Sequence, residues 1–278
     1  MRIAVPSWVI PGTYGENLRF LQKDSRIDTV ELLFFLYDEE VRAQLDTEWP
    51  IILEYAERFR YTVHLPDALT EDHEELIVRL LPLADHFVTH PGDPAKADTL
   101  AELISGWSRQ YSAQSARARL RAQSQAQSLS RAQSQVPARS RTLAQSQAQS
   151  QDFLFILENT QGNRLEALRE RLPKAGLCMD TGHLLLAGMD PADYYISNKE
   201  LIQEIHLHGV DREAAKSDGR LPDHRSISGR EPWFQRMEYE LRSFKGIVNT
   251  EVFSWAEAER SLRSLGERGL LVEGASHE

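Results

Sequence analysis

The sequence contains a single cysteine, Cys178, among its 278 residues. One cysteine cannot form a disulfide within the chain, and it cannot supply a zinc site built from several thiolates. Any metal ion that this protein holds must therefore depend on histidine and carboxylate ligands. We interpret Cys178 itself as a small buried apolar residue.

Long apolar runs are also lacking. No stretch approaches the roughly 20 apolar residues that a membrane-spanning helix needs. The N-terminal sequence MRIAVPSWVIPG is interrupted by Pro6, Ser7 and Pro11, so it does not form the apolar core of a signal peptide. We expect a soluble, cytoplasmic protein with no membrane partner.

Positive charge is in the minority, with 32 Lys and Arg against 42 Asp and Glu and a formal charge of −10. Broad binding to nucleic acid depends on neutralising phosphates. The balance therefore argues against a nucleic-acid partner and favours a small-molecule substrate. The sequence makes no prediction of the oligomeric state.

Short apolar segments alternate with amphipathic stretches along most of the chain, and apolar residues make up 41% of it. This alternation predicts an α/β protein, either a TIM (β/α)8 barrel of roughly 250 residues or an open doubly wound sheet. We favour the barrel as a single domain over residues 1–278. The expected strands are Arg2–Ser7, Asp28–Phe35, Tyr61–Leu65, His86–His90, Phe153–Glu158, Gly176–Asp180, Glu204–His208 and Gly246–Val252. The clearest helical patterns are Thr47–Phe59, Leu165–Leu172 and Ala256–Leu265.

A low-complexity run, Ser108–Gln151, interrupts the regular spacing of the elements. It is built on Ala-Gln-Ser and contains seven Arg but no Asp or Glu. We interpret it as an insertion between the fourth helix and the fifth strand, either flexible or extending that helix. A basic tether for nucleic acid or an acidic partner is the alternative. In a barrel, this connection lies on the face opposite the active site.

Histidine and carboxylate residues stand at or near the ends of the expected strands. In a TIM barrel the C-terminal strand ends meet at one mouth, so these side chains would converge. Imidazole and carboxylate are ligands for zinc, manganese and ferrous iron, and a site with several ions activates water and stabilises charged oxygens. The residues are Glu31, His64, His90, Glu158, Asp180, His183, His206, His208, Asp223, His224 and Glu251.

Each of these residues has a structural explanation when it is taken alone. A single His is often a hydrogen-bonded core residue, Glu158 could form a salt bridge, and Asp180 could cap the following helix. The joint pattern, in which six consecutive expected strands each end in a metal-competent residue, favours a metal centre.

The motifs ILENT, MDTGH followed by AGMD, and THPG resemble the xylose-isomerase-like TIM-barrel superfamily, and within it the endonuclease IV type. The resemblance covers nearly the whole chain except the insertion. It implies two or three divalent ions. It places His64 and His90 at one ion, Glu158 as a bridge to a second, and Asp180, His206 and Glu251 around that second ion. His183 and His224 would hold the third with a neighbouring carboxylate.

The chain departs from the endonuclease pattern at two places. The family's Asp-Arg-His motif appears here as Pro222-Asp223-His224-Arg225, which puts the role of Asp223 as a ligand in doubt. His64 is followed by LPDALTEDHEE, and this acidic stretch is poorly suited to a phosphate backbone. An abasic-site nuclease is therefore a weaker interpretation than the ligand set alone suggests.

Two other branches of the superfamily are similar. Sugar isomerases and epimerases use one ion, and there Glu158 and Glu251 would be the catalytic base and acid. The chain is more similar to cobamide-remodeling phosphodiesterases, on its ELLFF, MDTGHLLLAG and IHLHG segments. This branch releases the lower-ligand riboside phosphate and cobinamide from a corrinoid. His64 and His90 discriminate, because a one-metal enzyme does not need them.

We therefore predict a metal-dependent phosphodiesterase with zinc as the preferred ion and manganese or iron as alternatives. Glu158 and Glu251 are the predicted catalytic residues. His208, Asp223, Arg225 and Trp8 are the predicted substrate contacts. An apolar mouth would suit a corrin ring, with Phe34, Phe35, Trp233 and Phe234 as further candidates to line it. Glu31 could orient a ligand His or form a buried salt bridge, and we interpret His73 and His86 as structural.

Overall fold

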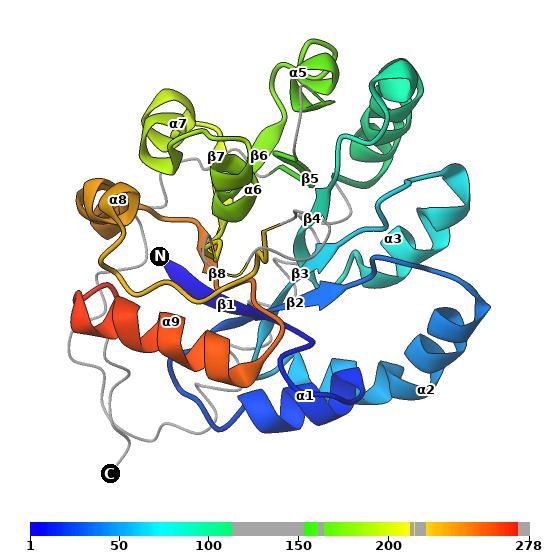
Figure 1. The fold of residues 1–278 in the computed structure, drawn as a ribbon. Coiled ribbons are helices and arrows are strands. Elements are labelled where there is room, and N and C mark those ends of the chain that lie inside the picture. Colours follow the sequence, from blue (N-terminus) through cyan, green and yellow to red (C-terminus); the bar gives the residue numbers. More distant parts are fainter. Residues whose placement is uncertain (113–152, 161–163, 212–213, 215–220, 272–278) are drawn as a thin grey trace, which may run out of the picture.

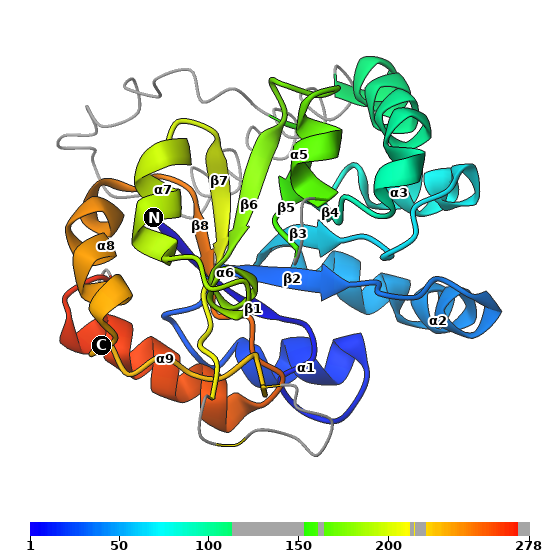
Figure 2. The same ribbon diagram turned by 45° about the horizontal axis from the view of Figure 1, so that its top comes forward.

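The structure is a computed structural model that describes residues 1–112, 153–160, 164–211, 214 and 221–271. Eight parallel strands form a closed barrel in which each strand pairs with the next and β8 (Ile247–Asn249) pairs with β1 (Arg2–Pro6). Figures 1 and 2 show this ring of strands with the helices packed around it. The barrel prediction is confirmed, and the open sheet is wrong because neither end strand has a free edge.

The remaining strands keep the predicted order but differ slightly in their bounds. They are β2 Thr29–Leu33, β3 Arg60–His64, β4 Ala84–Thr89, β5 Phe155–Glu158, β6 Gly176–Asp180 and β7 Ile202–His206. Several predicted ends run past the observed strands, since the residues that carry chemistry continue into the loops at the mouth. His208 and Glu251 are two such residues, each two positions beyond its strand.

The helices follow their strands as the fold requires. They are α1 Tyr14–Leu21, α2 Glu39–Tyr55, α3 Glu74–Leu80, a helix over residues 97–112, α5 Arg164–Arg169, α6 Thr181–Leu186, α7 Pro191–Asn198, α8 Pro232–Ser243 and α9 Trp255–Glu267. Two 3-10 turns, η1 Glu71–His73 and η2 Pro94–Lys96, precede α3 and the helix over 97–112.

Helix α2 begins earlier than the apolar spacing predicts. Asp38 caps its first turn by accepting a hydrogen bond from the backbone N–H of Val41, and Glu39 and Glu40 add the negative charge that a helix N-terminus favours. The first turns of this helix are largely exposed, whereas Leu45 and Ile52 are buried. The spacing of apolar residues therefore predicted only the second half of α2.

The main apolar core lies between the barrel and its helices. Phe34, Trp233 and Phe234 belong to this core and are at most 7% exposed. They do not line the mouth, because Trp233 and Phe234 turn inward from α8 and Phe34 packs among core residues next to β2. Some of the buried strand residues of the barrel are polar instead of apolar. Glu31, Thr62 and His206 are examples.

Residues 113–152 separate the helix over 97–112 from β5, which is the predicted position of the insertion. Apart from residues 108–112, which belong to that helix, the low-complexity run lies outside the described residues. Among the described helices, none has the length and apolar character required to cross a membrane.

Candidate metal centre

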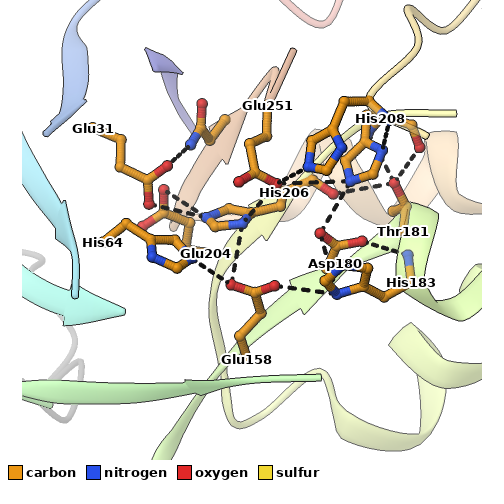
Figure 3. Close-up of polar contacts among 12 residues, drawn as sticks. Glu31, His64, Glu158, Asp180, Thr181, His183, Glu204, His206, His208 and Glu251 are labelled. Carbon is orange, nitrogen blue, oxygen red and sulfur yellow. Dashed lines mark hydrogen bonds and ion pairs between the residues drawn. The ribbon is translucent and has the colours of Figure 1, made fainter. Parts of the chain in front are cut away.

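Buried histidines and carboxylates from several strands meet at one end of the barrel (Figure 3). Glu31 comes from β2, His64 from β3, Glu158 from β5, Asp180 from β6 and His206 from β7. None of these five is more than 1% exposed. Because parallel strands end at the same face, residues far apart in the sequence become neighbours.

Glu158 divides its two carboxylate oxygens between two sets of imidazoles. Oε2 lies 3.0 Å from His64 Nε2 and 3.6 Å from His206 Nδ1. Oε1 lies 3.4 Å from His90 Nε2 and 3.3 Å from His183 Nδ1. The rings of His64 and His90 are 4.8 Å apart, so the structure brings together the two histidines that the sequence singled out.

A second set of potential ligands adjoins the first. Nδ1 of His206 lies 3.1 Å from Glu251 Oε2, and Asp180 completes a group whose ligand atoms lie within 4.8 Å of one another. Two further groups of this kind share Glu158, one with His64 and His206 and the other with Asp180 and His183. The described residues thus form overlapping sets of ligands, as a centre with more than one ion requires.

His208 and His224 form a stacked pair beside this centre, with ring centroids 4.3 Å apart and planes 8° from parallel. The backbone N–H of His224 donates to His208 Nδ1 at 3.0 Å, and His208 Nε2 lies 3.0 Å from Asp180 Oδ2. His208 is fully buried, as are Asp180 and His206, and its role as a substrate contact stays a prediction. His224, with Nε2 3.7 Å from Glu251 Oε2, forms a fourth candidate ligand group with His208 and Glu251.

The arrangement differs from the third site that the resemblance implies. His183 groups with Glu158 and Asp180, whereas His224 groups with His208 and Glu251. Asp223 lies beside His224, its Oδ1 3.3 Å from His224 Nδ1. His224 has a φ of 51°, the one positive value for a non-glycine residue in the part of the chain that the structure describes. Such a conformation costs energy and is commonly found at functional sites.

Two predicted substrate contacts, Arg225 and Trp8, are not members of the candidate ligand groups among the described residues. Arg225 pairs its backbone with Gly209 and directs its guanidinium to Glu257 of α9, at 3.9 Å. Trp8, just after β1, is 56% exposed. Phe35 is closer to the centre, with its ring 4.9 Å from that of His64.

The sequence reasoning missed two residues that orient the site. Asp67 places Oδ1 2.9 Å from His90 Nδ1, the nitrogen that faces away from Glu158. Asp67 comes three residues after His64 in the sequence, and this short spacing could have indicated a place at the site. The other acidic residues around Asp67 obscured this role.

Glu204 lies beneath His206, with Oε1 3.8 Å from His206 Nε2, and its other oxygen lies 2.5 Å from His86 Nε2. Glu204 and His206 are two apart on one strand, so the period of two could have indicated a shared face.

The mutual charges set the protonation states of this cluster. Burial alone would lower the pKa of His90 and of His183, but Glu158 and Asp67 beside His90, and Asp180 and Glu158 beside His183, raise each pKa to about 10. Burial opposes ionisation of Glu158, yet the charge of His90 and the hydrogen bonds from His183 and His64 hold its pKa well below the ordinary value. Burial also opposes ionisation of Asp180, but the charges of His208 and His183 lower its pKa.

The donor set fits divalent cations. Among the buried atoms without a hydrogen-bond partner in the described residues are His206 Nδ1 and Glu251 Oε2, which face each other in the second ligand set. Buried polar atoms are normally satisfied, so such a pair calls for a further partner. Imidazole nitrogen and carboxylate oxygen are suitable donors for zinc, manganese and iron. The residues present therefore fit a metal centre.

No family model and no curated protein matches this sequence. Solved structures match it over nearly its whole length. The probable 3-DHS dehydratase AsbF of Bacillus anthracis superposes with a TM-score of 0.55 at 11% identity, covering 96% of this chain and 98% of that one. A sugar phosphate isomerase/epimerase from Parabacteroides distasonis gives 0.52 at 10% identity, with 98% and 99% covered. A D-tagatose 3-epimerase-like protein gives 0.50 at 16% identity, with 96% and 97% covered. The chain has the xylose-isomerase-like TIM-barrel fold, and identities this low establish the fold alone.

Proposed function

We propose that this protein is a metal-dependent phosphodiesterase with an active site at the mouth formed by His64, His90, Glu158, Asp180 and Glu251. The observation that carries the proposal is the division of Glu158 between two sets of imidazoles. A carboxylate placed in this way can bridge two ions, and a site with two ions is suited to displacement at phosphorus. A one-metal isomerase has no need of the two further imidazoles, those of His64 and His90, beside Glu158.

Divalent ions, when bound, would supply Lewis acidity that activates water and neutralises the leaving oxygen. Zinc is the preferred ion, with manganese or iron as alternatives. In the overall reaction, water adds across one P–O bond of a phosphodiester to give an alcohol and a phosphate monoester. Glu158 would hold the ions and the water in position, and Glu251, which faces the same nitrogen of His206, would complete the set.

An apolar rim borders one side of the mouth and supports a corrinoid substrate. It consists of Trp8, Phe35, Leu36 and Phe253, which follow the adjacent strands β1, β2 and β8. Trp8, Leu36 and Phe253 are 56%, 70% and 43% exposed, and the rings of Phe35 and Phe253 lie 6.2 Å apart. Exposed apolar groups gathered beside a polar site commonly mark a binding surface. A broad, flat ring such as a corrin would cover this rim while its phosphodiester meets the ligands.

The test is chromatography of adenosylcobalamin after incubation with protein loaded separately with zinc, manganese or ferrous iron. We expect cobinamide and the riboside phosphate of the lower ligand as products. Absence of both products with every metal would refute the corrinoid substrate. The same preparations assayed on a chromogenic phosphodiester and on abasic DNA would then show whether hydrolysis itself also fails.

A sugar isomerase or epimerase is the second candidate, favoured by one observation. Asp180, His206 and Glu251 form one candidate ligand group, Glu158 Oε2 lies 3.6 Å from His206 Nδ1, and all four residues are buried, so the residues of a one-ion set are also present. His64→Ala distinguishes the two functions. We expect a loss of hydrolysis of about 100-fold or more if His64 holds an ion of the pair, but only a small effect on an isomerase. His73→Ala, which alters a histidine in η1 that is outside the ligand groups, is the matched control.

A further inference from the structure

The imidazole of His206 lies between two pairs of carboxylates inside the barrel (Figure 3). Its Nδ1 faces the mouth, 3.1 Å from Glu251 Oε2 and 3.6 Å from Glu158 Oε2. Its Nε2 faces the barrel interior, 3.2 Å from Glu31 Oε1 and 3.8 Å from Glu204 Oε1. The two nitrogens therefore meet different surroundings. Nδ1 is directed at the ligand groups of the mouth, whereas Nε2 faces a separate group that His206 forms with Glu31 and Glu204.

Glu31 is the better placed of the two interior carboxylates. Its Oε2 accepts a hydrogen bond of 2.7 Å from Asn249 Nδ2, which leaves Oε1 for His206. Oε1 of Glu204 is farther from His206 Nε2, at 3.8 Å, while Oε2 of Glu204 is paired with His86 at 2.5 Å. Glu31, Asn249 and His206 are all fully buried, so water does not substitute for any of these contacts.

We propose that Glu31 is a positioning residue for the metal centre: its Oε1 lies 3.2 Å from His206 Nε2, and its charge there keeps Nδ1 directed at the ion. An imidazole that coordinates through Nδ1 retains its proton on Nε2, and a carboxylate in front of that proton fixes the ring and increases the basicity of the ligand. Glu31 does not touch the substrate or the ion and acts through His206. The inference rests on the metal centre of the proposed function.

Two substitutions of Glu31 separate this role from simple packing. Glu31→Leu fills the volume but offers no acceptor, so we expect the affinity for zinc to fall by about 10- to 100-fold. Glu31→Gln keeps an acceptor oxygen but not the charge, so we expect a smaller loss, of a few-fold. The absorption spectrum of the cobalt(II)-loaded protein reports the coordination of His206 independently of activity, and we expect it to change more in the Leu variant than in the Gln variant.

Thr62→Val is a matched control. Thr62 pairs in register with Glu31 on the adjacent strand, is fully buried, and has a hydroxyl without a hydrogen-bond partner in the described residues. This variant alters a polar group at the same level of the barrel, and we expect wild-type affinity and a wild-type cobalt spectrum. Thermal unfolding of the metal-free proteins shows whether any change in affinity merely follows a loss of stability.

Wild-type affinity and spectrum in the folded Glu31→Leu variant would overturn the proposal. If that variant does not fold, an unchanged affinity in Glu31→Gln overturns it instead. A wild-type protein that binds no metal would refute the proposed function as well. A wild-type protein that binds metal but hydrolyses no phosphodiester would refute only the function and leave the role of Glu31 in place.

Discussion

Oε2 of Glu158 lies 3.0 Å from Nε2 of His64, although 94 positions separate the two residues in the sequence. The other oxygen of Glu158 faces His90 and His183. One carboxylate thus connects the ends of four different elements. Its removal tests the whole centre more directly than the removal of any single histidine.

Glu158→Gln should lower turnover by at least about 100-fold while leaving the fold intact. The amide keeps the volume of the carboxylate but loses its charge, so the ions lose their shared ligand. Steady-state rates and metal content, each compared with the circular dichroism of the variant, provide the measurement. Near-normal turnover with a full complement of metal would refute the bridging role.

Gly182 is required by the close approach of His208. A Cβ at position 182 would lie 2.0 Å from His208 Cε1, so the ring would have to leave Asp180. We expect Gly182→Ala to destabilise the protein by about 1–3 kcal/mol and to weaken metal binding. Gly106→Ala is the control, because a Cβ there meets nothing within 4 Å and should be neutral or slightly stabilising. Chemical denaturation of both variants would show the difference, and equal stabilities would contradict it.

Metal binding should release protons at neutral pH. In the metal-free protein His90 and His183 each have a pKa near 10, above the ordinary value of 6.5, so both are protonated at pH 7. An ion can bind these nitrogens only after their protons leave, and affinity should therefore rise with pH. Calorimetry of zinc binding in buffers of different ionisation enthalpy counts the protons. Binding heats that do not depend on the buffer would exclude these two histidines as ligands.

The same shifts have the opposite consequence for the metal-free fold. A raised pKa in the folded state means that these two histidines stabilise it fully below pH 6.5. This contribution is lost as the pH rises toward 10. Metal-free and zinc-loaded proteins should therefore diverge in melting temperature as the pH increases over this range.

Asp85 stabilises the barrel away from the metal centre. It accepts hydrogen bonds from Arg2 and Arg60, and although burial opposes its ionisation, these guanidinium groups lower its pKa from 3.8 to about 2. We expect Asp85→Asn to lower the free energy of unfolding by about 2 kcal/mol at neutral pH. Because the folded pKa is depressed, the difference from wild type should persist above pH 4 and shrink as the pH falls toward 2. Urea denaturation at several pH values provides the test, and a difference that does not vary with pH would contradict it.

The sequence by itself determined the barrel, the order of its strands and the kinds of residue at its mouth. Strand segments such as Gly176–Asp180 are encoded locally, by short apolar runs between helical patterns. Since parallel strands end at one face, the grouping of His64, Glu158 and Asp180 followed from the fold class alone.

Only the tertiary structure decided which atom faces which. It buried His208 against Gly182, directed Arg225 toward Glu257, and turned Trp233 into the core instead of the mouth. It also placed Glu31 beneath His206 on the opposite side of the ring from Glu251. These relationships depend on the register of strands around the closed barrel and on packing across its interior. Both are set by contacts between residues distant in the sequence, which the local periodicity of each strand does not encode.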